Sequence, residues 1–129
     1  MTAEGVVTKS SDYAVGETVT RLTDLIEARG LTLFAVIDHS GEALRVGLQL
    51  PATKLLIFGD PAAGTPVMAF APLAALDLPL KVLVAEGADG AVSVSYNDPG
   101  FIAARYGLTD DLRARLEGVG PLTDTVHGA

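Results

Sequence analysis

Two short polar stretches interrupt an otherwise aliphatic chain, and they hold the residues best suited to chemistry. The first is Asp38-His39, which follows an apolar run; a carboxylate beside an imidazole could act as a general base pair or supply two metal ligands. Neighbouring residues on a strand point to opposite sides, so the two could cooperate only if a turn has begun. The structural alternative is that Asp38 caps the next element and His39 forms local hydrogen bonds. The other histidine, His127, is expected in a frayed terminal segment.

The second stretch is the loop from Gly59 to Thr65. Gly59, Asp60 and Pro61 end an apolar strand with turn-forming residue types. Backbone N–H groups at the start of a following helix could bind an anion. However, Asp60 is itself negative, and the loop has neither a Lys nor a Walker-type phosphate motif, so a neutral polar group, a cation or a metal suits it better than phosphate. The structural alternative is a plain strand-to-helix turn in which Asp60 hydrogen-bonds its own loop.

These stretches supply all the candidate ligand-binding residues, and the sequence assigns no catalytic residue and no cofactor. The candidates are Asp38, His39, Gly59, Asp60, Pro61 and Thr65. Asp38, His39 and Asp60 form the one set worth testing for metal. Three potential ligands without a recognisable spacing do not define a metal site.

Composition narrows the classes of function. A chain of 129 residues predicts one domain, residues 1–129, and the absence of cysteine excludes disulfides, thiolate metal sites and cysteine nucleophiles. A net charge of −7 argues against nucleic acid and anionic membrane as partners. No segment approaches the roughly 20 apolar residues that span a bilayer. The first residues lack a basic region followed by an apolar one, so the expected compartment is the cytoplasm.

The pattern of apolar residues predicts an alternation of strands and helices. In the first half we expect a strand over 5–10, a helix over 15–29 that buries Val15, Leu22 and Ile26, and a strand over 31–38. Residues 42–46 fit either a short helix, which is favoured, or one arm of a hairpin. A buried strand follows over 54–58, and Thr65 as N-cap with Pro66 in the first turn predicts a helix starting there.

The second half contains the clearest local signal. Strands over 80–86 and 91–96 flank a tight turn at 87–90 and predict a β-hairpin. A helical segment over 101–106 and a last helix over 109–127, weakened by glycines and a proline, complete the chain. Interleaved helices around an antiparallel hairpin predict an α+β fold, with one largely antiparallel sheet and helices packed on one face.

Five blocks of sequence, in this order, resemble one known family. They are LFAVIDH (33–39), GLQLPATKLLIFGDP (47–61), GTPVM (64–68), ALDLPLKVLV (75–84) and VSYND (94–98). Together they resemble the bacterial domain-of-unknown-function family DUF302 over a core of about residues 6–108. The resemblance implies a curved antiparallel sheet of about five strands, of the TATA-binding-protein-like class, and frequent homodimers, but no established reaction. Members of that family typically carry Asn-Pro where this chain has Asp60-Pro61.

Three hypotheses about function follow. The leading one is a non-enzymatic, dimeric domain that binds a small molecule or a partner, with its pocket where the strand ends at Asp38 and Gly59 meet the helix starting at Thr65. The second is a metal-assisted hydrolase or lyase that uses Asp38, His39 and Asp60. The third is a structural oligomer that buries the apolar region 67–76 between subunits.

Overall fold

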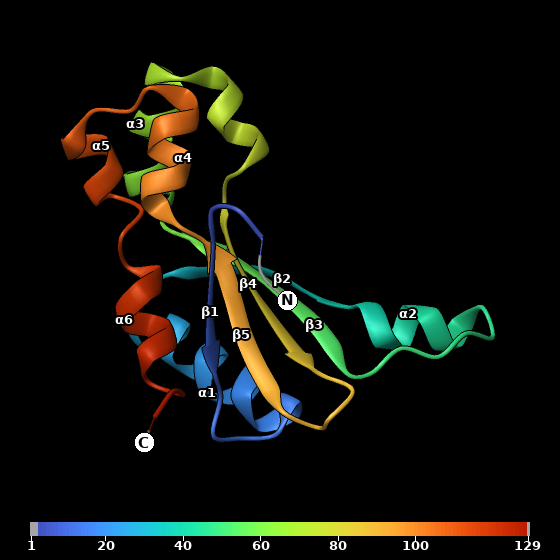
Figure 1. Cartoon of the computed structure of the whole chain (residues 1–129). Coiled ribbons are helices and arrows are strands. Elements are labelled where there is room, and N and C mark those ends of the chain that lie inside the picture. Colours follow the sequence, from blue (N-terminus) through green and yellow to red (C-terminus); the bar gives the residue numbers. More distant parts are fainter. Residues whose placement is uncertain (1–2, 129) are drawn as a thin grey trace.

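A computed structural model describes residues 3–128, and its centre is a five-stranded antiparallel sheet (Figure 1). The strand order is β1-β5-β4-β3-β2, and every neighbouring pair is antiparallel. The strands are β1 (Val6–Ser10), β2 (Thr32–Asp38), β3 (Thr53–Gly59), β4 (Leu80–Glu86) and β5 (Val92–Asn97). Helices α1 (Val15–Ala28) and α6 (Val119–Asp124) pack on one face of this sheet. The predicted α+β fold and its layer arrangement are confirmed.

The apolar run before Gly59 forms β3, which lies inside the sheet between β2 and β4. Leu56 and Phe58 point to the face that α1 covers and are fully buried. Leu55 and Ile57 point to the opposite face and are partly buried. A strand flanked on both sides and apolar on both faces reads as a continuous apolar run, which explains the sequence pattern.

The larger hydrophobic core, here called the sheet core, fills the space between the sheet and the helices α1 and α6. The helical spacing correctly predicted that Val15, Leu22 and Ile26 face inward, since all three are buried in it. The buried residues of the sheet core are Val15, Leu22, Ile26, Leu56, Phe58, Val82, Val84, Val94, Tyr96, Val119, Leu122 and Val126.

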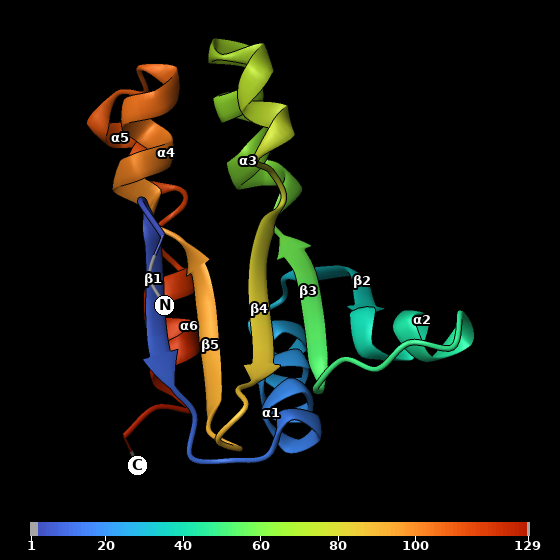
Figure 2. The ribbon, with the colours of Figure 1, turned by 45° about the vertical axis from the view of Figure 1, so that its right-hand side comes forward.

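A second, smaller core lies in a group of short helices at one end of the sheet, here called the helical cap (Figure 2). The cap consists of α3 (Pro61–Phe70), the 3₁₀ helix η1 (Pro72–Leu76), α4 (Pro99–Tyr106) and α5 (Asp110–Ala114). The carboxylate of Asp77 accepts hydrogen bonds from Arg105 and from the Tyr106 hydroxyl, and thereby ties η1 to α4. The buried residues of the cap core are Val67, Ala74, Leu78, Ile102, Leu112 and Leu116.

A projecting segment leaves the other end of the β2–β3 pair and stands away from the rest of the molecule (Figures 1 and 2). This arm consists of α2 (His39–Arg45) and residues 46–52. Residues 42–46 thus lie in and directly after a helix, as favoured from sequence. Three of the arm's apolar side chains are largely exposed: Leu44 at 70%, Val46 at 72% and Leu48 at 64%.

The start of α3 differs from the sequence prediction. The helix begins at Pro61 with Asp60 as its N-cap, whereas Thr65 and Pro66 lie inside it. Asp60-Pro61 and Thr65-Pro66 both fit the cap-then-proline signature. The first pair directly follows β3 and takes the capping role, and Pro66 then leaves the helix one N–H short.

The C-terminal part also differs from prediction. Two short helices, α5 and α6, occupy the range where one helix over 109–127 is expected, and the break falls at residues 115–118. The expectation that His127 lies in a frayed segment is wrong: its Nδ1 lies 2.8 Å from the backbone oxygen of Ser10. Within residues 3–128 no helix has both the length and the apolar character needed to cross a membrane.

Candidate functional site

A cavity of about 430 Å³ lies where the helical cap meets the sheet. The end of β3, the first turns of α3, the segment leading into β4 and the link between α5 and α6 line it. Phe58 belongs to the sheet core, and Leu78 and Leu116 belong to the cap core. The cavity is therefore a seam between two separately packed cores, with walls that are mainly apolar.

Glycines at the β3–α3 junction keep this space open. A methyl group built on Gly59 would lie 3.6 Å from the Cβ of Pro79 and 3.9 Å from the ring of Phe34. One built on Gly64 would lie 3.9 Å from the terminal methyl of Met68. These are ordinary contact distances, so a methyl group at either position would take up space there without a clash.

Three polar side chains stand at the rim of the cavity: Asp60, Thr65 and Arg115. The Oδ1 atom of Asp60 accepts the backbone N–H of Ala62 at 2.9 Å, which is the local hydrogen bond that the structural alternative expects. Within the described part of the chain, the Thr65 hydroxyl and the Arg115 guanidinium have no hydrogen-bond or ion-pair partner. The rim therefore offers one cation and one hydroxyl that are free to meet a ligand.

Asp38 and His39 are not part of this site. Antiparallel pairing puts Asp38 opposite Lys54 and Thr32 opposite Gly59, so the two polar stretches lie at opposite ends of β3. At roughly 3.3 Å per residue along a strand, about 20 Å separates the level of Lys54 from Asp60. This corrects the expectation that the strand ends at Asp38 and Gly59 meet in one pocket.

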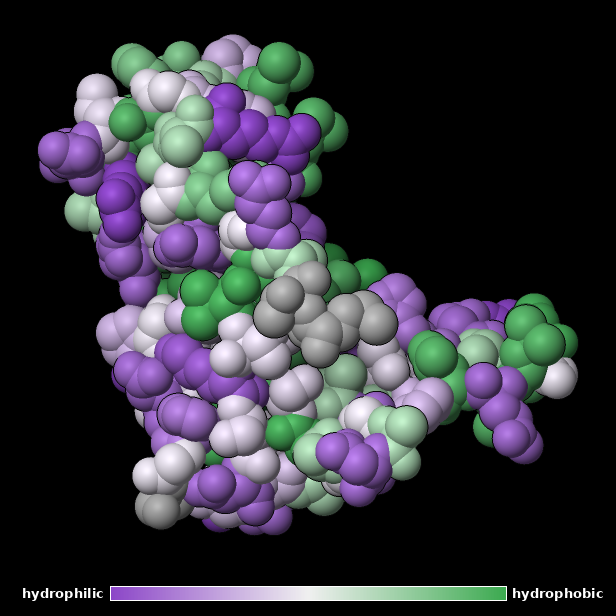
Figure 3. Space-filling view, in the orientation of Figure 1, coloured by the Kyte–Doolittle hydropathy of each residue, from purple (hydrophilic) through white to green (hydrophobic). Residues whose placement is uncertain are grey.

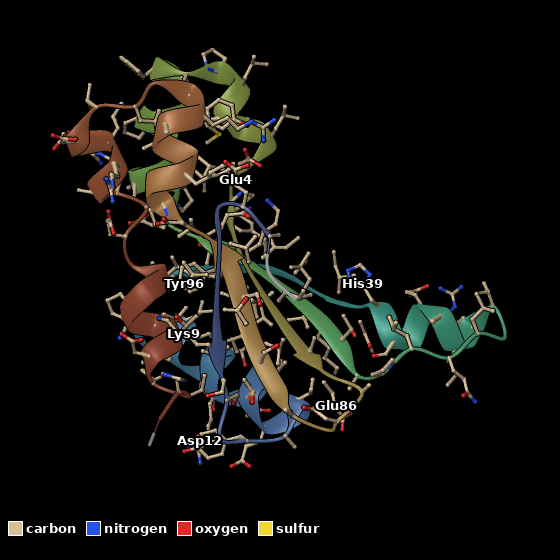
Figure 4. All side chains as sticks on the ribbon, viewed as in Figure 1. Glu4, Lys9, Asp12, His39, Glu86 and Tyr96 are labelled. Atoms are coloured by element: carbon tan, nitrogen blue, oxygen red, sulfur yellow. The ribbon has the colours of Figure 1, made fainter. Side chains whose placement is uncertain are left out.

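The structure gives Asp38 a local role. Its Oδ1 accepts the hydroxyl of Ser40 at 2.6 Å and the N–H of Gly41 at 2.9 Å, so it caps α2. These hydrogen bonds, the one from Ser40 foremost, hold the pKa of the Asp38 carboxyl below its usual value. His39 lies at the base of the arm, far from the cap (Figure 4). Among residues 3–128, no three His, Asp or Glu side chains come together in a group that could hold a metal ion.

A second hollow lies under the arm and is more open to solvent than the first. Asp38, Ser40 and Leu44 line it from the start of the arm, and residues 48–52 line it from the end. The hydroxyl of Ser40 accepts the N–H of Thr53 at 3.1 Å and so fastens the start of α2 to β3. The candidate residues Asp38 and His39 thus belong to the base of the arm.

The part of the cavity lining outside residues 58–65 was not predicted as a site from the sequence. Met68 reads as an ordinary helix residue, and Leu78, Arg115 and Leu116 read as parts of a turn and a helix. They come to the cavity through the packing of the cap onto the sheet. The candidate residues from the sequence therefore lie on the β3–α3 side of this cavity, and none of them lies on the opposite wall.

Comparison with protein families gives one clear match. The model described as "Domain of unknown function DUF302" matches residues 7–120. A solved structure of an uncharacterised conserved DUF302 protein from Bacillus stearothermophilus superposes with a TM-score of 0.78 over 96% of each chain, at 16% identity. At that identity the likeness shows the shared fold.

Curated relatives come from Brucella and are named as channels. The "Fluoride-specific ion channel FluC 1" of Brucella suis is 37% identical over 128 residues, which cover 96% of this chain and 50% of that protein. The protein of the same name in Brucella abortus is 37% identical and matched over 47% of its length. The chain thus spans about half the length of these relatives.

Proposed function

The chain belongs to the DUF302 family, and from its structure we propose that it binds a small, mainly apolar molecule in the cavity between the sheet core and the helical cap. The proposed ligand-binding residues on the β3–α3 side are Gly59, Asp60, Pro61 and Thr65. The single observation that carries the proposal is an apolar cavity of about 430 Å³ bordered by free polar groups. We place this function in the cytoplasm as part of the same proposal.

The size and lining of the cavity support this function. Ligand pockets generally measure about 300–1,000 Å³ and combine apolar walls with a few polar groups. At roughly 30 Å³ per water molecule, 430 Å³ corresponds to about fourteen waters. Side chains such as Phe58, Met68 and Leu116 offer few hydrogen bonds to water in that space. An organic molecule of about ten to fourteen non-hydrogen atoms would fill it better.

Binding is a better-supported role than the metal-assisted hydrolysis considered from sequence. That reaction needs Asp38, His39 and Asp60 around one substrate, and the β2–β3 register keeps them apart. One oxygen of Asp38 and one oxygen of Asp60 are also engaged as helix caps. The geometry therefore supports a pocket without this set of reacting groups.

Met68 gives a site-specific test, because the chain contains only two methionines and Met68 lines the cavity. Protein with ¹³C-labelled methionine methyl groups is titrated with octan-1-ol, a neutral probe with nine non-hydrogen atoms. We expect the Met68 signal, assigned with Met68→Leu, to shift and saturate. We expect Gly59→Val, which places two methyl groups in the cavity, to weaken binding at least tenfold.

The control for this test is Gly16→Ala in α1, where, apart from the adjacent residues and the backbone of its own helix, no described atom lies within 4 Å of the new methyl group. It should bind octan-1-ol as the unaltered protein does. Equal binding by a folded Gly59→Val variant, or a linear shift without saturation, would contradict the proposal.

The name of the Brucella relatives makes fluoride a specific alternative ligand to test. Fluoride is small and strongly hydrated, and apolar walls cannot replace its water. We expect sodium fluoride to shift the Met68 signal no more than sodium chloride at equal ionic strength. A saturable shift specific to fluoride would replace the organic ligand by a halide in this proposal.

A second candidate function is association with a protein partner through the arm. Leu44, Val46 and Leu48 are exposed on one projecting segment, and green surface gathers at its tip in Figure 3. Exposed apolar groups of this kind mark interaction surfaces. The side chains of Glu42 and Arg45 form an ion pair at 2.7 Å, so neither of these two charges on the arm lacks a partner. We propose a second copy of the chain as the partner, giving a homodimer.

A further inference from the structure

We propose that the ligand is a single-headed amphiphile whose carboxylate binds Arg115 and whose alkyl chain fills the cavity. This inference rests on the proposed function, since it specifies the chemical class of the molecule in the same cavity. It depends on the one cationic side chain in the lining, which the sequence did not bring to attention.

Arg115 differs from most arginines of the chain in having no ion-pair or side-chain hydrogen-bond partner among residues 3–128. Four of the six arginines form ion pairs, namely Arg21, Arg45, Arg105 and Arg113 with Glu17, Glu42, Asp77 and Glu117. Of the remaining two, Arg29 lies at the end of α1, where a cation suits the helix dipole. Arg115 lies in the link after α5 and lines the cavity. A guanidinium without an internal partner at an apolar cavity is a ready acceptor for a carboxylate, which it can bind through two parallel hydrogen bonds.

The Asp60 carboxylate at the rim of the cavity does not pair with the Arg115 guanidinium. Asp60 and Arg115 both line the cavity but form no ion pair, and Asp60 already accepts the N–H of Ala62. An ammonium headgroup at Asp60 is the competing arrangement. The anionic headgroup is favoured because its partner has all its donors free, whereas the Asp60 carboxylate has one oxygen engaged.

The rest of the lining determines the body of the ligand. Leu31, Phe34, Phe58, Met68, Leu78 and Leu116 present aliphatic and aromatic surface from four different segments. Such walls favour a flexible hydrocarbon over a sugar or a nucleotide, because those molecules would leave many hydroxyl or phosphate groups without partners. A medium-length alkyl carboxylate meets both requirements, and octanoate with ten non-hydrogen atoms is a suitable probe.

The test compares three probes of equal chain length by isothermal titration calorimetry: octanoate, octan-1-ol and octylammonium. We expect octanoate to bind most tightly. Arg115→Gln should weaken octanoate binding about tenfold and leave octan-1-ol within twofold, because a charge-assisted hydrogen bond is worth roughly this factor. Arg45→Gln makes the same change in net charge on the arm, which lies at the other end of the β2–β3 pair from the cavity (Figure 1), and it should change neither.

Asp60→Asn provides an independent variant, since asparagine caps helices as well as aspartate does. It removes the negative charge from the rim and should strengthen octanoate binding severalfold. It should also weaken any binding of octylammonium. Circular dichroism melting of each variant verifies that the fold is retained.

The outcomes separate the two proposals. Equal affinity for octanoate and octan-1-ol, with no effect of Arg115→Gln, would overturn the carboxylate inference and leave the cavity as an apolar site. Tightest binding of octylammonium, lost in Asp60→Asn, would overturn it in favour of a cationic ligand. If none of the three probes binds, both the inference and the proposed function fail. Both also fail if probes bind but Gly59→Val weakens the binding of none of them.

Discussion

Three aspartates show how the same side chain can suggest chemistry and serve structure. Asp38 is the last residue of β2, whereas Asp60 and Asp98 directly follow β3 and β5. Each accepts the N–H of a residue two or three positions later, at the start of a helix. A helix start has N–H groups without partners, and a carboxylate oxygen satisfies one of them. The aspartates at these strand ends therefore act as helix N-caps. A polar group that is free to bind a ligand has to be sought at other positions.

Gly5 illustrates a residue whose type is fixed by its surroundings. Its φ of +74° lies in the left-handed region, and a methyl group on it would lie 2.3 Å from the ring of Phe101. We predict that Gly5→Ala destabilises the fold by at least about 1–2 kcal/mol from the backbone alone. Urea unfolding followed by circular dichroism measures this.

Gly16 is the matched comparison for Gly5. It is helical in α1, its added methyl group would contact nothing within 4 Å, and Gly16→Ala should leave stability unchanged or raise it by up to about 1 kcal/mol. If both substitutions had the same effect on the free energy of unfolding, the packing of Phe101 on Gly5 would be wrong.

At the scale of elements, one lysine joins β1 to α6 (Figure 4). The Lys9 ammonium donates to the carbonyl of Gly120, the hydroxyl of Thr123 and the carboxylate of Asp124, and lies 5.1 Å from the ring centre of Tyr96. Although burial alone would lower it, the pKa of Lys9 is raised by its hydrogen bonds to Asp124 and Tyr96. The same contact lowers the pKa of Asp124. The contacts of Lys9 with Gly120, Thr123 and Asp124, here called the clasp, hold α6 against β1 at the edge of the sheet.

We predict that Lys9→Met destabilises the protein by about 1–3 kcal/mol, because it leaves acceptors unpaired at the sheet edge. The clasp has a defined pH window. The contribution of Asp124, whose pKa is lowered, is lost as pH falls below the usual value of 3.8. The contribution of Lys9, whose pKa is raised, is lost as pH rises through its folded value above 10.5.

Urea unfolding at pH 3 and 7 measures the acid side of this window, and Asp124→Asn is the partner variant. Asparagine still accepts a hydrogen bond, so Asp124→Asn should cost less than Lys9→Met at pH 7, and its cost should become smaller as the pH falls towards 3. An effect of Asp124→Asn that is the same at both pH values would show that the ion pair does not contribute.

The helices and strands also show which parts of the structure could be predicted from the sequence. The strands, α1 and the β3–α3 side of the site follow from local signals, because periodicity and turn residues act within a few positions. The start of α3 could not be decided locally, since Asp60-Pro61 and Thr65-Pro66 carry the same signature. In β2 a register shift between Leu33 and Ala35 sends these two residues to different faces, although strict alternation predicts one. Arg115 enters the site only through tertiary packing.

At the scale of the molecule, the sheet core and the cap core meet at the cavity. The sheet core combines α1, α6 and the sheet, whereas the cap core is made by short helices from two distant parts of the chain. A ligand in the seam would contact both cores and thereby stabilise the cap on the sheet, as any molecule that binds only the folded state does. The arm points away from this seam, so the proposed binding and dimer functions use separate surfaces (Figure 1).

The dimer proposal predicts a light-scattering mass twice that of the chain. Leu44→Glu, on the arm, should shift the protein to a monomer without a change in its melting profile by circular dichroism. Leu73→Glu, on the helical cap and equally exposed at 70%, is the control and should leave the dimer intact. Dissociation by Leu73→Glu alone would move the interface to the apolar region 67–76, and a monomer at all concentrations would rule out the homodimer.

The most direct test of the account is a crystal structure of the unaltered protein with saturating octanoate. If an alkyl carboxylate binds in the cavity, we expect continuous electron density for its alkyl chain between Phe58, Met68 and Leu116. Its carboxylate should lie within about 3 Å of the Arg115 guanidinium. Octanoate bound only on the outer surface, or a seam closed by its own side chains while octanoate saturates the protein in solution, would contradict it.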